Sequence, residues 1–129
     1  MPDETIVRLK ITSSSRTPEQ ITDIIGIPCD KSWRVGDRRA NTVIEEKNNG
    51  WVLDSGLSKL TALDAHVEAL LKRLSPQVDD IRRLSTQATV EFSCVIYAKS
   101  PPALNFPNSV ICQIGQLGAS LDIDLYVLD

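Results

Sequence analysis

The sequence predicts an α+β protein built on a mixed, mostly antiparallel five-stranded sheet, with helices packed on one face. Three segments alternate apolar and polar residues, as half-buried strands do. Other segments repeat apolar residues at helical spacing, and the two kinds are interspersed along the chain. With 129 residues the chain is long enough for one hydrophobic core, so we expect a single domain spanning residues 1–129.

The first strand and the first helix have clear local signals. Glu4–Thr12 alternates apolar and polar residues, which predicts a strand with one wet face. Thr17 suits a helix N-cap, Pro18 the first helical position, and Gln20 completes a capping box. Gly26 follows the apolar stripe and is expected to end this helix in a left-handed conformation.

The next stretch is expected to be an irregular loop followed by a hairpin. Residues 27–39 have no periodicity, and the loop they predict contains Trp33. Residues 41–46 and 51–55 resemble strands, and Asn49-Gly50 between them is the strongest short-range signal for a hairpin turn.

Two helices and a strand occupy the middle of the chain. Leucine and valine recur at helical spacing from Leu63 to Leu74, with His66 at the edge of the apolar stripe and therefore half exposed. Ser75-Pro76 interrupts this helix and starts a shorter one. Residues 88–97 alternate again as a strand, and a proline-bearing loop then runs to residue 107.

The last segment, Asn108–Leu128, combines a helix, a glycine stop at Gly118 and a strand. The apolar residues of this strand are expected to form a central row of the core, with its polar residues on the opposite face. If the two middle helices count as one, the element order matches the ferredoxin-like βαββαβ pattern with an added C-terminal helix and strand.

Composition excludes several classes of function. The formal charge is −3 and no stripe of Lys or Arg is present, which disfavours nucleic-acid binding. No apolar run approaches the ~20 residues of a membrane span, so we expect no membrane association and a cytoplasmic location. The three cysteines are an odd number at wide spacing, which fits neither a disulfide framework nor a zinc site. Cys94 and Cys112 are expected to be buried, and no cofactor or metal is predicted.

Several short motifs, in order along the whole chain, resemble one known family. They are Thr17–Ile21, Gly26–Pro28, Trp33–Asp37, Trp51, Leu70-Leu71 and Leu117–Tyr126. On these residues the chain is similar to the bacterial domain of unknown function 4279. The resemblance implies a small soluble bacterial domain with no assigned reaction. Cys29 stands where family members often have threonine, which implies that cysteine-based activity is not a family property.

The polar row of the last strand is one candidate binding surface. Asp122 and Asp124 point the same way, and carboxylates in this arrangement could hold a hard cation or transfer protons. The alternative is that Arg8 and Lys10 of the first strand balance these charges as cross-strand pairs. The residues expected on this polar face that could contact a partner are Glu91, Tyr97, Asp122, Asp124 and Tyr126.

The loop around Trp33 is the second candidate. Trp33, Gly36 and Asp37 could line a ligand pocket, or Trp33 could fold back over the helix ends. A cysteine nucleophile at Cys29 would need a base, and His66 is the only histidine. No catalytic constellation is recognisable, so we predict no catalytic residues and do not expect an enzyme.

The first functional hypothesis is therefore a small binding or regulatory module, of the immunity or adaptor type, that presents its polar sheet face to a basic protein partner. The alternative from another class is a small-molecule sensor or minor enzyme with a pocket at the Trp33 loop. A third hypothesis makes the polar face a homodimer interface.

Overall fold

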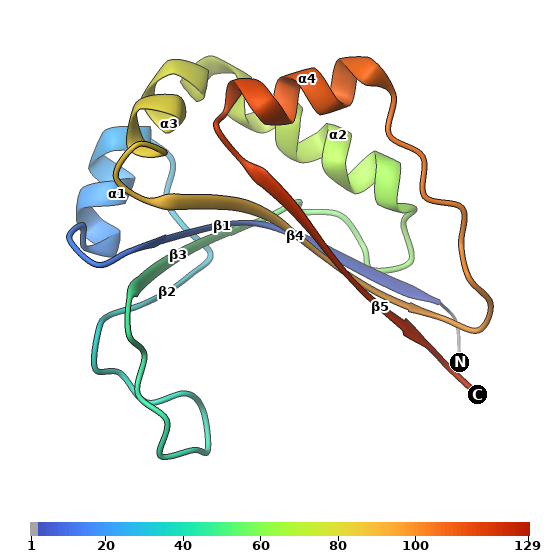
Figure 1. Cartoon of the computed structure of the whole chain (residues 1–129), viewed down its shortest axis with the longest axis horizontal. Helices are drawn as coiled ribbons and strands as arrows, with labels where there is room; N and C mark the ends of the chain where they lie inside the picture. The colour runs from blue at the N-terminus through green and yellow to red at the C-terminus, as the bar shows by residue number, and fades with distance from the viewer. Residues whose placement is uncertain (1–2) are drawn as a thin grey trace.

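A computed structural model describes residues 3–129 and confirms the expected architecture, a five-stranded mixed sheet with the helices on one face (Figure 1). The elements are β1 (Glu4–Ser13), α1 (Pro18–Ile25), β2 (Lys31–Trp33), β3 (Asn49–Asp54), α2 (Leu63–Leu74), the 3-10 turn η1 (Ser75–Gln77), α3 (Val78–Leu84), β4 (Thr89–Ala98), α4 (Asn108–Gln116) and β5 (Ser120–Val127).

The strand order in the sheet is β2-β3-β1-β4-β5. The central strand β1 is antiparallel to both β3 and β4, and β2 is antiparallel to β3 at one edge. β5 lies at the other edge, parallel to β4, because α4 carries the chain back to the end of the sheet at which β4 began. The register aligns Glu4 with Tyr97 and Tyr97 with Tyr126, so both ends of the described chain lie at the same end of the sheet (Figure 1).

The core lies between the helices and one face of the sheet. The register places Leu9 and Ile11 of β1 beside Leu53 and Trp51 of β3, and all four side chains are fully buried. Apolar residues of β4 extend this layer as predicted, and α2 covers it with a stripe of buried side chains. The buried side chains of the α2 stripe are His66, Val67, Leu70, Leu71 and Leu74.

The first helix forms as its sequence predicts. Thr17 Oγ1 accepts a hydrogen bond from the Gln20 backbone N–H at 3.2 Å, and Gln20 Oε1 accepts one from the Thr17 N–H at 3.0 Å. Gly26 ends the helix with φ 81°. The capping box and the glycine stop are therefore confirmed. At Ser75-Pro76 the chain forms the turn η1 before α3, although Ser75 donates its hydroxyl hydrogen to the Lys72 carbonyl and caps no helix.

The predicted hairpin around Asn49-Gly50 is wrong. Residues 41–46 form no strand, both Asn49 and Gly50 lie inside β3, and the partner of β3 is the short strand β2, which ends at Trp33. Gly50 is needed for contact rather than for a turn, since a Cβ on it would lie 2.0 Å from Cε2 of the Trp33 indole. Residues 34–48 instead form a long loop that projects below the sheet (Figure 1).

The prediction that β5 supplies a central row of the core is also wrong. β5 is an edge strand, and every residue in it is exposed except Ile123, which is half-buried. The side chains of Leu121, Leu125 and Val127 are 36%, 39% and 54% exposed. The alternation correctly predicts which residues share a face, but the helices above the sheet leave most of this apolar row uncovered.

Two smaller expectations about burial also fail. His66 is fully buried instead of half exposed, because the segment that joins β3 to α2 folds over it. Cys112 of α4, which was expected to be buried, is exposed, as is its neighbour Ile111, because only Val110 and Ile114 of that helix face the core. Cys94 is fully buried as predicted.

Candidate functional site

The two candidate surfaces predicted from the sequence share the open face of the sheet, opposite the helices. Trp33 of β2 pairs with Gly50, which is aligned through Thr12 of β1 with Thr89 of β4. The acidic and tyrosine residues of β4 and β5 follow on the same face. The predicted binding residues that lie on this face are Trp33, Glu91, Tyr97, Asp122, Asp124 and Tyr126.

Trp33 lies across the backbone of Gly50 rather than over the helix ends. The Nζ atom of Lys10 lies 5.8 Å from its ring centroid, which is within reach of a cation–π interaction. The indole is half-buried in this position. Trp33 therefore joins the projecting loop to the open face of the sheet.

Gly36 and Asp37 shape the beginning of the projecting loop. Gly36 adopts φ 89°, and its N–H donates to the Glu46 carbonyl at 2.8 Å. The Asp37 carboxylate accepts a hydrogen bond from the Arg34 N–H at 2.8 Å, and the Asp37 carbonyl accepts one from the Glu46 N–H at 2.7 Å. Both residues are exposed, and their polar groups hold the loop in shape.

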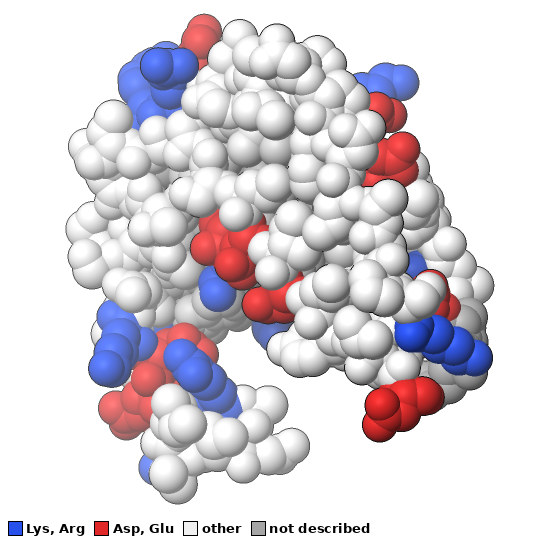
Figure 2. Space-filling view, turned by 45° about the vertical axis from the view of Figure 1, so that its right-hand side comes forward, with Lys and Arg blue, Asp and Glu red and all other residues white. Residues whose placement is uncertain are grey.

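The cross-strand balance of charge that the sequence suggested is present only in part: Lys10 is aligned with Glu91, but Asp122 and Asp124 have no such partner. Arg8 forms an ion pair with Asp54 at 2.9 Å, and Lys10 lies over Trp33. Across residues 3–129, no Lys or Arg nitrogen lies within 4.0 Å of Asp122 or Asp124. Figure 2 shows acidic side chains across the middle of this side of the molecule, beside the hollow that separates the projecting loop from the body.

Glu91 carries the electrostatic consequence of this arrangement. Burial raises its pKa, the carboxylates of Asp122 and Asp124 raise it further, and the Lys10 ammonium opposes them. Within residues 3–129, no group of three or more His, Cys, Asp or Glu side chains is arranged to hold a metal ion.

Two tyrosines extend this row toward the ends of their strands. The rings of Tyr97 and Tyr126 are stacked, with centroids 5.2 Å apart and planes inclined by 17°. Tyr126 is 52% exposed, so one face of the pair remains in water. Tyrosine is enriched in protein interfaces, because its rigid ring contributes contact area at a low cost in side-chain entropy.

We expect Glu91→Gln to raise the melting temperature at pH 7. Because the pKa of Glu91 in the folded protein lies above the ordinary 4.5, ionisation of this group costs stability as the pH rises through 4.5. The gain should disappear near pH 4, where the carboxyl group is protonated in both folded and unfolded chains. Thermal unfolding at both pH values measures the effect, and Glu45→Gln on the projecting loop is the control. An equal gain from both substitutions would contradict the account.

The outer edge of β5 carries unpaired backbone groups. The Leu128 N–H donates to the Ala98 carbonyl of β4 at 2.7 Å. Since backbone groups alternate sides along a strand, the even-numbered residues of β5 face β4 and the odd-numbered residues face outward. In the described part of the chain, β5 is the last strand of the sheet on this side. Leu121, Ile123, Leu125 and Val127 therefore present their N–H and C=O groups at an open edge.

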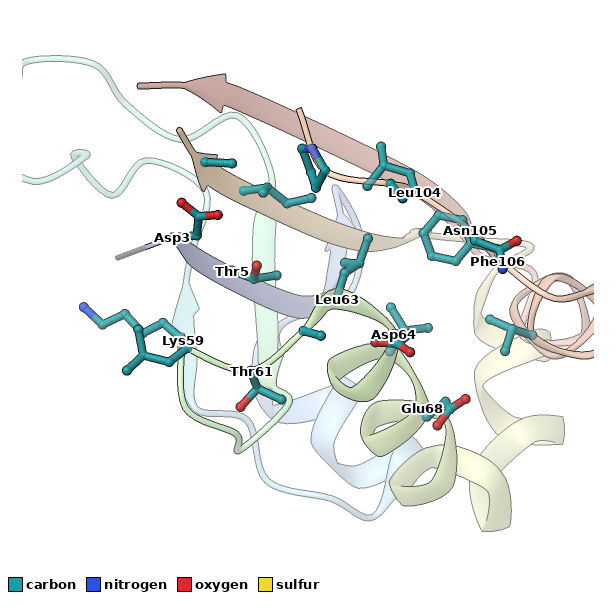
Figure 3. Close-up of a pocket in the computed structure, with 18 of the residues that line it drawn as sticks. Asp3, Thr5, Lys59, Thr61, Leu63, Asp64, Glu68, Leu104, Asn105 and Phe106 are labelled. Atoms are coloured by element: carbon teal, nitrogen blue, oxygen red, sulfur yellow. The ribbon is translucent and has the colours of Figure 1, made fainter. Parts of the chain in front are cut away.

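A cavity on the helix side of the sheet was not predicted. It has a volume of about 430 Å³ and lies between α2, the sheet and the loop of residues 99–107 (Figure 3). Thr5 of β1 lines it, together with Leu63 of α2 and Phe106 of the loop. None of the binding residues predicted from the sequence lines this cavity. No local sequence pattern predicts this cavity, because three segments that are distant in sequence form its walls.

The structure does not bring His66 and Cys29 together as a base and its nucleophile. His66 Nδ1 lies 2.6 Å from Ser55 Oγ, and its buried Nε2 has no hydrogen-bond partner, so neither nitrogen contacts Cys29. Burial raises the pKa of the Cys94 thiol to about 12, and the carboxylates of Asp122 and Glu91 add to this effect. Cys94 is therefore an unreactive core residue at neutral pH.

The buried imidazole predicts a loss of stability in mild acid. Burial lowers the pKa of His66, which the nearby Ser58 and Thr61 carbonyls oppose. As the pH falls below about 6.5, the imidazole of His66 is therefore protonated in the unfolded chain but stays neutral in the folded chain. The free energy of unfolding should decrease over this pH range. Urea unfolding at pH 7.5 and pH 5.5 measures this. The His66→Asn protein, which retains a polar atom near Ser55, should lose less stability between these two pH values. An unchanged pH dependence would be inconsistent with a buried neutral His66.

Comparison with known proteins supports the resemblance noted in the sequence. No curated protein and no solved structure matches the chain. Among residues 3–129, no helix has the length and apolar character required to cross a membrane. The family model for the domain of unknown function DUF4279 matches residues 3–128, nearly the whole chain. The chain thus belongs to the DUF4279 family.

Proposed function

We propose that this chain is a small bacterial, cytoplasmic binding or regulatory module, of the immunity or adaptor type, that acts by occupying a basic protein partner. The observation that carries the proposal is the β5 edge. Asp122 and Asp124 form an acidic row on this strand, and no Lys or Arg of residues 3–129 makes an ion pair with either of them. The same strand has backbone groups that face outward at the edge of the sheet. Such an edge can accept another strand through main-chain hydrogen bonds.

The two rows of β5 define the chemistry of the partner strand. Toward the helix side, the apolar side chains of Leu121, Leu125 and Val127 are 36% to 54% exposed. Toward the open face, Asp122 and Asp124 are exposed and attract cations. A partner strand that alternates apolar residues with Lys or Arg would match both rows when it adds to β5.

A second copy of this chain fits the same edge less well. In a pair of β5 strands, the acidic row of one copy would lie beside the acidic row of the other, and like charges at that distance repel. Sedimentation velocity therefore should show a monomer. A dimer that Tyr126→Arg dissociates would identify a second copy as the occupant and overturn the proposal of a basic partner.

A pair of substitutions at Leu125 tests strand addition. The Leu125 N–H faces outward, so Leu125→Pro removes one edge donor and leaves the pairing of β4 with β5 intact. Leu125→Ala removes the side chain and retains the donor. Each protein is used to recover bound proteins from the native host. We expect Leu125→Pro to lose the partner and Leu125→Ala to retain at least part of it. Equal retention of the same partner by both variants, or no partner for the unaltered chain over a range of salt concentrations, would overturn the proposal.

The immunity form of the proposal makes a separate prediction about the genome. An immunity protein is encoded beside the toxin that it neutralises, so a neighbouring gene for a basic toxin is expected. An adaptor has no such requirement, and the neighbouring genes therefore discriminate between the two forms.

A further inference from the structure

We infer that the cavity between α2 and the loop of residues 99–107 is a binding site for a small organic amine with a compact apolar body. The site lies on the helix side of the sheet, so this inference is independent of the proposed partner surface. Its volume of about 430 Å³ falls within the range of small-molecule sites in proteins.

The walls of the cavity are mostly apolar. Ile96 and Ala98 of β4 lie on the sheet side, Leu63 and Val67 on the side of α2, and Phe106 on the side of the loop. Of these, Ile96, Ala98 and Val67 are at most 3% exposed, so the deep part of the cavity is formed by rigid core residues. An apolar body would replace water there and gain the free energy of removing apolar surface from solvent.

The charged residues of the cavity favour a cation. Asp64 and Glu68 are one helical turn apart on the same side of α2 (Figure 3). Neither carboxylate has a Lys or Arg nitrogen within 4.0 Å in residues 3–129. Lys59 is the only basic residue in the lining, and its Nζ lies 3.3 Å from Glu4 Oε2. Figure 3 shows the Lys59 side chain extending away from the cavity.

Thr5 provides a further polar group. Its side chain lines the cavity and is only 8% exposed. Its backbone N–H donates to the Lys59 carbonyl at 2.7 Å, and its hydroxyl is not engaged by another side chain of the cavity lining within the described residues. Because Thr5 lines the cavity and its hydroxyl is not sealed from solvent, the hydroxyl is free to bond to water or to a ligand. The site therefore combines apolar walls, a pair of carboxylates and one additional hydrogen-bonding group.

The charge preference is tested with three probes of similar size, 2-phenylethylamine, 2-phenylethanol and 3-phenylpropionate. Each is titrated into the ¹⁵N-labelled full chain to about 10 mM, a range suited to ligands of this size, while amide resonances are followed by NMR. We expect the amine to shift resonances around Thr5, Leu63 and Phe106. The neutral alcohol should bind at least about tenfold more weakly, and the carboxylate more weakly still.

Two variants locate the site. Asp64→Asn with Glu68→Gln keeps the shape of the cavity and should abolish the preference for the amine. Ala98→Leu fills the cavity and should weaken binding of every probe, while Glu45→Gln on the projecting loop should change nothing. The inference is overturned if the amine causes no shifts, if the alcohol binds as tightly as the amine, or if the double variant retains the preference. These outcomes do not depend on whether a protein partner binds β5.

Discussion

Replacing both Asp122 and Asp124 by Lys is expected to reduce affinity for the protein partner by about 100-fold or more. Each reversal exchanges an attraction for a repulsion against a basic partner, and like-charge juxtaposition at an interface costs several kcal/mol, where about 1.4 kcal/mol is a factor of ten. The fold should survive, because both side chains are exposed and neither forms an ion pair within residues 3–129.

The matched control places the same change in net charge on the helix side of the molecule. Asp23 of α1 and Asp79 of α3 are exposed and outside the cavity, and the variant that changes both to Lys should retain the partner. Circular dichroism establishes that both variants are folded, and retention of the partner at several salt concentrations gives the comparison. If the two variants lose the partner equally, net charge rather than the β5 row governs binding.

The largest effect on stability is expected from Trp51→Ala, with a loss of about 3–5 kcal/mol in the free energy of unfolding. Trp51 is fully buried between the sheet and α1, and its Nε1–H donates to Thr22 Oγ1 at 3.0 Å. Trp33→Ala removes a half-buried ring from the open face and should cost less than about 2 kcal/mol. Urea unfolding followed by circular dichroism measures both.

The ranking of the two tryptophans is the decisive feature of this experiment. If Trp51→Ala is too unstable to study, Trp51→Phe is used instead. Phenylalanine retains most of the apolar area but cannot make the hydrogen bond to Thr22, so a measurable loss in the free energy of unfolding is still expected. A larger loss for Trp33→Ala than for the Trp51 variants would show that the open face, and not the helix side, holds the main core.

Local signals predicted the elements whose determinants are local. The capping box at Thr17 and Gln20 and the glycine stop at Gly26 depend on neighbouring residues, and all three form as expected. Alternation in β1 and β4 predicted their inward and outward rows, because both strands lie inside the sheet. The likeness to ferredoxin-like proteins stays a prediction, since no solved structure matches the chain.

The failures have tertiary causes. Asn49-Gly50 matches a hairpin turn, but the Trp33 indole needs the space above Gly50, and this contact joins residues 17 positions apart. Alternation in β5 is the same for a central strand and for an edge strand, so the sequence could not show that this row lacks a cover. The prediction that His66 is half exposed rests only on its position on the helix, whereas the segment that buries it lies outside the helix.

The candidate sites show the same division. The acidic and tyrosine residues were predicted together because they share one face of two strands, and Trp33 lies on that same face. Its arrival there depends on the pairing of β2 with β3, which the sequence did not reveal. The cavity depends on the path of residues 99–107 over α2, for which the sequence offers no pattern.

The central claim, that a basic strand of another protein adds to β5, is tested most directly by photocrosslinking in the native host. Benzoylphenylalanine replaces Tyr126, which is on the open face beside the edge, or Arg82, which is exposed on α3, on the helix side of the sheet. We predict that position 126 links to one protein through a segment alternating apolar residues with Lys or Arg, and that position 82 does not. Links of equal strength from both positions, or none from position 126, would contradict the account.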